Sequence, residues 1–294
     1  MAVGEPKFEN LVFEGGGVRG VAYAGALKVF EEQGLLPGVR RVAGASAGAF
    51  AALLLSLGYS SDRLKDALRS IHFKTLEDKP NPLRVVSHYG LYKGDVLHDW
   101  ILRQVTNLGL PESLTFEGLN ERGGRDLTVF ATDLTTCNTR EFSFEQTPQT
   151  SVVGAVRASM SIPLMYAAWQ FPGGEPDDHV YVDGGVAYNY PIGAFDAVDV
   201  NSGTLGFRFV RGGDSAQIAE HQPHNFFEYA KNLFAAVMSA QNINFEHDPA
   251  QVRRSVLIDD LGFRATDLSL SDADFNRLYA SGYEATKRYL GGLG

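Results

Sequence analysis

The ten residues Arg41–Phe50 constrain the fold of this chain more than any other stretch. They run from a short apolar strand through a G-A-S-A-G turn into Ala49–Leu57, an alanine- and leucine-rich segment that favours a helix. A serine on such a sharp strand-to-helix turn is typical of a G-x-S-x-G nucleophile elbow, here with Ser46 at its apex. We expect glycine at 44 and 48 because a side chain there would collide with the neighbouring strand or helix.

The elbow places Ser46 at a helix N-terminus, where the helix dipole favours a developing alkoxide. The alternative interpretation is a small-residue turn in which Ser46 only caps the next helix. Short Gly/Ser patterns also recur by chance, so the rest of the chain has to decide between the two.

A second glycine turn precedes the elbow. The expected strand Phe8–Glu14 runs into G-G-G-V-R-G, and the helix Val21–Gln33 follows. The turn matches the dinucleotide fingerprint G-x-G-x-x-G through Gly15, Gly17 and Gly20. That fingerprint also requires an acidic residue at the end of the second strand. The expected second strand, residues 39–43, runs into the elbow instead, so the dinucleotide interpretation fails there.

The same glycine turn has another use. Consecutive glycine N–H groups at a helix N-terminus form a nest for negative charge. If the two turns lie side by side on adjacent strands, this nest faces Ser46 and is suited to be an oxyanion hole. Arg19 would hold the loop or add positive charge to it; the alternative is a structural ion pair.

A third turn, Asp183-Gly184-Gly185, follows the expected strand His179–Val182. Open α/β sheets place functional groups at the carboxyl ends of strands, which makes Asp183 a candidate functional residue. An Asx-turn explains the Asp-Gly pair equally well.

The remaining chain predicts further elements of an α/β sheet. Strands are expected at 127–132, 140–144, 166–171, 205–210 and 255–258, and helices at 60–72, 94–105, 151–159 and 271–290. The strand at 140–144 alternates and is expected to pair antiparallel with 127–132. Between 79 and 92 the chain reads as a polar, aromatic connection, and 74–95 is the best candidate for a mobile cap or lip.

The segment Asn225–Met238 has apolar residues at helical spacing, at 226, 227, 230, 233, 234 and 237. We expect this face to pack into the core; a lipid-facing surface is the alternative.

Composition excludes several classes of protein. With 26 basic and 35 acidic residues, the net charge of −9 argues against non-specific binding to nucleic acid or anionic membranes. The one cysteine, Cys137, fits a reducing compartment and is expected to be a small buried side chain. Because residues 1–10 are polar, we expect no secretory signal there, and the longest apolar run, Ala47–Leu57, is too short to span a bilayer. We expect a soluble protein, cytoplasmic or delivered by a dedicated secretion system.

Three motifs in this order, G-G-G-V-R-G at 15–20, G-A-S-A-G at 44–48 and D-G-G at 183–185, resemble the patatin-like phospholipase family. The segments A-T-D-L at 131–134, A-V-R-A-S-M-S-I-P at 155–163 and N-Y-P at 189–191 support the resemblance. It implies a three-layer α/β/α fold with a central, mostly parallel sheet, related to the catalytic domain of cytosolic phospholipase A2. It also implies one domain over residues 1–294, with a candidate cap or lip at 74–125.

The resemblance also implies calcium-independent hydrolysis of lipid acyl esters by a Ser–Asp dyad, without a metal or cofactor. Ser46 is then the nucleophile and Asp183 the base. The implied oxyanion loop consists of Gly15, Gly16, Gly17 and Arg19, and the remaining motif glycines are Gly20, Gly44, Gly48, Gly184 and Gly185. The implied partners are a phospholipid or other acyl-ester lipid and a transient membrane surface, with no nucleic acid. A protein or small-molecule activator is left open.

Two other functions remain as alternatives. A Ser-His-Asp esterase is available in chain order, because His221, His224 and His247 follow Asp183. A non-catalytic module could use the glycine loop to bind phosphate or a nucleotide. The dyad has a difficulty of its own, since an aspartate with an unperturbed pKa of ~3.9 is a poor base for a serine proton.

Overall fold

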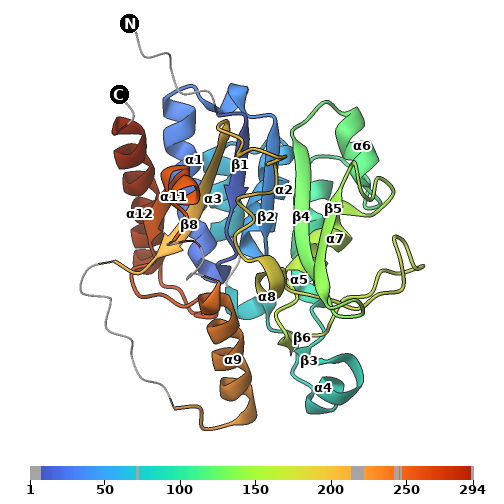
Figure 1. Ribbon diagram of the computed structural model, residues 1–294. Helices are drawn as coiled ribbons and strands as arrows, with labels where there is room; N and C mark the ends of the chain where they lie inside the picture. Colours follow the sequence, from blue (N-terminus) through green and yellow to red (C-terminus); the bar gives the residue numbers. More distant parts are fainter. Residues whose placement is uncertain (1–7, 71–72, 213–221, 242–244, 246, 293–294) are drawn as a thin grey trace, which may run out of the picture.

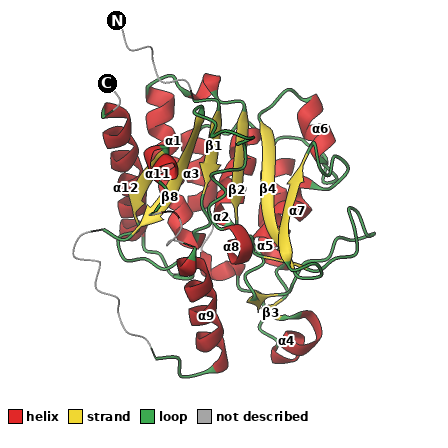
Figure 2. Ribbon diagram, in the orientation of Figure 1, coloured by secondary structure: helices red, strands yellow, loops and turns green. Residues whose placement is uncertain are grey.

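A central β-sheet with helices on both faces forms the body of the computed structural model, which describes residues 8–70, 73–212, 222–241, 245 and 247–292 (Figures 1 and 2). Within these residues the sheet has seven strands in the order β5-β4-β2-β1-β8-β9, with β7 paired to β4. Its strands are β1 Asn10–Phe13, β2 Arg41–Ala45, β4 Asp126–Asp133, β5 Asn138–Ser143, β7 Tyr181–Val182, β8 Thr204–Val210 and β9 Ser255–Asp259. Neighbours are parallel except where β5 and β7 pair with β4.

A small parallel sheet of β3 Gly90–Tyr92 and β6 Leu164–Tyr166 lies beyond the end of the large sheet. The helices are α1 Val21–Glu32, α2 Ala47–Ser56, α3 Ser61–Arg69, α4 Pro82–His88, α5 Asp95–Thr106, α6 Phe116–Glu121, α7 Val152–Ser159, α8 Gly185–Tyr188, α9 Phe226–Ala240, α11 Pro249–Arg253 and α12 Asp272–Gly291. Three short 3-10 helices are η1 Gly17–Gly20, η2 Leu36–Gly38 and η3 Phe73–Leu76. No helix in the described part of the chain is long and apolar enough to cross a bilayer.

The two faces of the sheet carry cores of different size. Side chains alternate along each strand, so Leu11 and Phe13 enter the large core under α1, α2, α7 and α12. Val12 and Ala43 enter a smaller core on the opposite face, which Tyr190 and Ile192 cover. The expected three-layer α/β/α fold with a mostly parallel sheet is confirmed.

Most expected elements are present, and the antiparallel pairing of β5 with β4 is confirmed. Three expectations were wrong. The connection at 79–92 contains a helix, α4, which Pro82 begins and the Asn81 side chain caps. The expected strand at 166–171 is reduced to β6, with an isolated bridge from Trp169 to Tyr181. Cys137 is exposed because it lies in the turn between β4 and β5.

The expected core-packing face on α9 was also wrong. Ala230 and Phe234 are buried, but Phe226, Leu233 and Val237 are exposed. The side chain of Phe227 lies outside the described residues. The helix extends from one end of the sheet and packs mainly on α8 and β6, so the body of the protein covers only part of its apolar surface (Figure 1).

Candidate active site

The G-A-S-A-G turn forms a strained connection between β2 and α2. Ser46 has a φ of 51° and a ψ of −124°, a backbone conformation that residues other than glycine rarely adopt. A Cβ on Gly44 would lie 2.3 Å from the carbonyl carbon of Gly48, and one on Gly48 would lie 2.2 Å from the carbonyl oxygen of Phe13. Both predicted collisions are therefore present, and the Ser46 N–H is held by the Ser159 hydroxyl at 2.8 Å.

The side chains of Ser46 and Asp183 meet although 137 positions separate them in the chain. The Ser46 hydroxyl donates to Oδ2 of Asp183 at 2.7 Å and makes no capping bond to α2. The other carboxylate oxygen, Oδ1, accepts the N–H of Gly185 at 2.7 Å. The Asx-turn is therefore present as well, and it orients the carboxylate toward Ser46.

Burial changes the acid strength of Asp183. The residue is fully buried, and loss of hydration raises the pKa of its carboxyl from 3.8 to about 7. Hydrogen bonds from Ser46 and Gly185 act in the opposite direction without cancelling the effect of burial. The expected difficulty of a weakly basic aspartate is therefore much reduced in the folded protein.

The glycine loop lies directly beside the elbow. Parallel pairing of β1 with β2 ends both strands at the same edge of the sheet, and a Cβ on Gly15 would be 3.3 Å from Cβ of Ser46. The Gly15 N–H donates to the carbonyl of Asn189 at 2.9 Å. In the described part of the chain, the N–H groups of Gly16 and Gly17 donate to no protein acceptor.

Arg19 supports this loop from the side. Its Nε donates to the Gly16 carbonyl at 3.2 Å, its guanidinium forms an ion pair with Asp260 at 3.5 Å, and it stacks on Phe209. The structure thus combines the loop-holding role and the ion pair that the sequence left as alternatives. Gly17 has a φ of 54°, and a Cβ there would lie 1.8 Å from the carbonyl oxygen of Ala265.

The other motif glycines sit at close contacts. A Cβ on Gly184 would lie 2.2 Å from the Phe130 carbonyl oxygen, and one on Gly185 would lie 3.0 Å from Oδ1 of Asp183. The contact at Gly20 is looser, because a Cβ there would lie 3.2 Å from Cβ of Ala47. These glycines let the three turns at this edge of the sheet pack against one another.

Several positioning residues had no role assigned from the sequence. Thr132 donates its hydroxyl to the Asp183 carbonyl at 2.9 Å, and Ser159 holds the elbow. Asn189 donates to Glu14 at 3.2 Å and accepts the Gly15 N–H. Thr132, Ser159 and Asn189 lie in the segments 131–134, 155–163 and 189–191, which supported the family resemblance. The sequence patterns of these segments do not indicate what the three side chains contact.

Gln241, at the C-terminal end of α9, had no sequence signal at all. Its amide nitrogen donates to the carbonyls of Gly185 at 2.8 Å and Val186 at 3.2 Å. Its amide oxygen accepts the Asn189 N–H at 2.8 Å. The loop that carries Asp183 is therefore hydrogen-bonded directly to α9.

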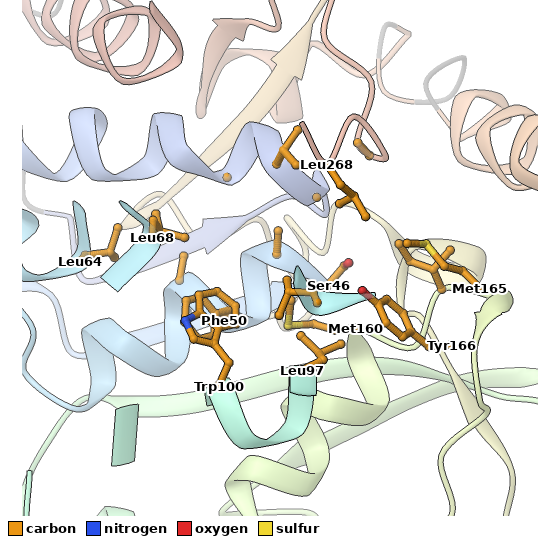
Figure 3. Close-up of a pocket in the computed structure, with 18 residues that line it drawn as sticks. Ser46, Phe50, Leu64, Leu68, Leu97, Trp100, Met160, Met165, Tyr166 and Leu268 are labelled. Atoms are coloured by element: carbon orange, nitrogen blue, oxygen red, sulfur yellow. The ribbon is translucent and has the colours of Figure 1, made fainter. Parts of the chain in front are cut away.

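An apolar pocket opens beside Ser46 (Figure 3). Met165 and Tyr166 of β6 lie on one side of the serine, and Phe50 and Trp100 lie on the other. Hydrocarbon side chains from α2, α3, α5 and the loop before α12 form the rest of the wall, among them Ala51, Leu64, Leu68, Leu97 and Leu268. Such a lining suits an acyl chain better than a phosphate or a nucleotide.

Histidine side chains take no part in the hydrogen bonds of Ser46 and Asp183 within the described residues. His224 and His247 are exposed. His221 lies outside the described residues, and His179 pairs with Asp133 instead. In the same part of the chain, no group of three or more His, Cys, Asp or Glu side chains is placed to hold a metal ion.

Comparison with known proteins places this site in a family. A model of the patatin-like phospholipases matches residues 11–196, which include the glycine loop, the elbow and the Asp-Gly-Gly turn. The chain belongs to the patatin-like phospholipase family. This membership supports a lipid hydrolase activity.

Two curated relatives and one solved structure are also similar to this chain. The uncharacterized protein R571 of Acanthamoeba polyphaga mimivirus is 27% identical over 98% of this chain and 95% of its own length. The probable lipid hydrolase 463L of Invertebrate iridescent virus 6 is 28% identical over 64% of this chain and 63% of its own. The crystal structure of VipD from Legionella pneumophila superposes with a TM-score of 0.68 at 16% identity, over 98% of this chain and 67% of that one. The VipD likeness shows a shared fold.

Proposed function

We propose that this chain is a lipid acyl hydrolase of the phospholipase A or lysophospholipase type, which releases fatty acids through a Ser46–Asp183 dyad and an acyl-enzyme. The observation that carries the proposal is the 2.7 Å hydrogen bond from the Ser46 hydroxyl to a fully buried carboxylate, with Ser46 in the wall of an apolar pocket. The pocket accommodates the acyl chain, and the ester carbonyl then lies beside Ser46.

In the first step Ser46 Oγ attacks the ester carbonyl carbon while its proton passes to Oδ2 of Asp183. The negative charge that develops on the carbonyl oxygen needs donors that are already in place. The N–H groups of Gly16 and Gly17 meet this need, because the N–H of Gly15 is already bonded to Asn189. The protonated Asp183 then gives its proton to the departing alcohol oxygen.

In the second step a water molecule attacks the acyl-enzyme. Asp183 accepts the proton of that water, and the carbonyl oxygen again receives the glycine N–H groups. Collapse of the intermediate releases the fatty acid and returns the proton to Ser46. Each step uses groups of this chain, so we expect a calcium chelator to leave turnover unchanged.

Two observations favour this mechanism over its alternatives. Among the described residues, no histidine hydrogen-bonds to Ser46 or Asp183, which counts against a Ser-His-Asp triad. The pocket beside the glycine loop is apolar, which counts against a phosphate-binding module.

The test is release of p-nitrophenol from a medium-chain p-nitrophenyl ester, followed by fatty acid release from phospholipid vesicles. Ser46→Ala is expected to lower turnover by about a thousandfold or more, and Asp183→Asn by about a hundredfold or more. His224→Ala and His247→Ala serve as matched controls and should keep wild-type rates. Loss of turnover in a folded histidine variant would contradict the dyad.

If the wild type is inert on both substrates, a fluorophosphonate label distinguishes the two possible causes. Labelling at Ser46 would establish a competent nucleophile that lacks its activator or substrate. No labelling, under conditions in which a control hydrolase reacts, would contradict the proposed function.

A further inference from the structure

The helix α9 presents hydrocarbon to solvent along one line. Tyr229, Leu233 and Val237 succeed one another at intervals of four residues, so they share a face of the helix. All three are exposed, Leu233 by 51%, while Ala230 and Phe234 face the body of the protein. We refer to these three exposed residues as the α9 stripe.

A second exposed apolar group lies on α4. Leu83 and Val86 are 81% and 83% exposed, and no residue of this helix is buried. We refer to these two residues as the α4 patch. They fall within the 74–125 segment in which the sequence suggests a lip, whereas α5 of that segment is packed into the core through Leu97, Trp100 and Ile101.

The helices that carry the stripe and the patch lie next to the small β3–β6 sheet, and β6 contributes to the pocket wall. The helix α4 packs against β3, β3 pairs with β6, and β6 contacts α9, so the four elements form a continuous band at one end of the molecule (Figures 1 and 2). In the middle of this band β6 carries Met165 and Tyr166, which line the pocket beside Ser46 (Figure 3).

We propose that the α9 stripe and the α4 patch dock this protein on the surface of a lipid bilayer, so that the pocket wall formed by β6 lies next to the acyl chains. This inference rests on the proposed function and adds the surface from which the substrate is drawn. An acyl chain could then enter the pocket from the bilayer without crossing water.

The chemistry of the band favours a lipid of no net charge. The helix α9 has no charged residue from position 232 to 240, and its Glu228 and Lys231 are of opposite charge. The helix α4 adds Arg84, and the whole chain has a net charge of −9. An amphipathic helix with this composition inserts its apolar side at the boundary between headgroups and acyl chains. Hydrocarbon burial therefore supplies the affinity, and anionic headgroups would weaken it.

The experiment measures sedimentation of the full chain with vesicles of a phosphatidylcholine whose chains are ether-linked, so that the lipid is not hydrolysed. The test variant is Leu233→Glu with Val237→Glu. The matched control is Val198→Glu, because Val198 is 99% exposed. It precedes β8 and therefore lies toward the end of the strands opposite to Ser46, which follows β2. The same proteins are assayed on a soluble p-nitrophenyl butyrate and on ester-linked phosphatidylcholine vesicles.

We expect the double variant to bind vesicles at least about tenfold more weakly than wild type, because two buried hydrocarbon contacts are lost. Its rate on vesicles should fall in parallel, while its rate on the soluble ester stays at the wild-type value. Val198→Glu should match wild type in all three measurements.

Several results would overturn the docking proposal. One is wild-type turnover of the soluble ester without vesicle binding, which would leave the proposed function intact. Another is equal binding by the double variant, and a third is binding only to anionic vesicles. A wild-type dimer that the double variant converts to a monomer, without vesicle binding, would identify the stripe as a contact between copies. If wild type had no Ser46-dependent turnover on any ester, the proposed function itself would fail.

Discussion

Asp183 is fully buried, yet the reaction proposed for it begins with its charged form. Burial raises the pKa of this carboxyl to about 7, so the fraction able to accept a proton increases through neutral pH. We therefore expect turnover of a soluble ester to rise with pH and to be half-maximal near pH 7. A rate that is already constant from about pH 5 upward would show that a carboxyl of ordinary acidity governs the reaction.

The same raised pKa predicts how stability depends on pH. Between the ordinary pKa of 3.8 and about 7 the folded protein holds this proton more tightly than the unfolded chain does. The stability that Asp183 contributes is therefore present below that window and is lost as the pH rises through about 7. Asp183→Asn removes this dependence but keeps an oxygen for the Gly185 N–H and an amide for Ser46.

Thermal unfolding at about pH 4 and pH 8 measures this effect. At each pH the free energy of unfolding of wild type is subtracted from that of Asp183→Asn, and the two results are compared. The free energy of unfolding of Asp183→Asn minus that of wild type should increase from the lower to the higher pH, by at most about 4 kcal/mol, because only wild type loses stability. All other titrating groups are common to both proteins and cancel. An equal difference at the two pH values would mean that folding does not change the pKa of Asp183.

At the scale of elements, the pocket is a space between α2, α3 and α5, and Ala51 is one of its small wall residues. Ala51→Leu should shorten the space available to an acyl chain. We expect the rate on long-chain p-nitrophenyl esters to fall relative to the rate on short-chain esters. The added side chain also costs about 1–3 kcal/mol of stability through crowding. The ratio of the two rates on one preparation is unaffected by the fraction folded, and an unchanged ratio would place the acyl chain elsewhere.

The sequence predicts the local turns of this site better than the surroundings of its helices. Gly44 indicates the elbow because its collision, with the backbone of Gly48, is local, whereas the collision at Gly48 is with Phe13 of the neighbouring strand. The meeting of Ser46 with Asp183 depends on the order of strands, which no local pattern contains, and it was expected only through the family resemblance. The pKa of Asp183 depends on burial by groups distant in the chain, so the sequence gives no sign of it.

Exposure of a helix is equally hard to predict. The periodicity of α9 identifies an apolar face correctly but cannot indicate whether other elements cover it. The helix α4 has a capping Asn81 and Pro82, but with no buried residue it lacks the apolar period that would reveal a helix. The strand β6 has three residues, too few to show alternation.

For the whole molecule, we propose that residues 1–294 form one domain, although the family match ends at residue 196. The strand β1, which leads into the glycine loop, lies between β2 and β8, and β8 lies beyond the match. The Ala265 carbonyl, which accepts the Val18 N–H at 3.2 Å, also lies beyond it.

A chain cut after Asp196 tests this view. It would leave β1 as an exposed, apolar sheet edge, and such edges promote aggregation. We expect this fragment to be aggregated in size-exclusion chromatography, whereas a chain cut after Gly292 keeps every described element and should be as soluble as the full chain. A folded, monomeric fragment of residues 1–196 would show that the matched region is an independent unit.

Gln241 belongs both to the helix that carries the α9 stripe and to the hydrogen bonds of the Asp183 loop. Coupling between two binding events is reciprocal. If docking changes the affinity of the site for an acyl chain, then a bound acyl chain changes the affinity for the bilayer by the same factor. Gln241 would then influence how long the enzyme remains on a membrane, and so how many lipids it cleaves before it leaves.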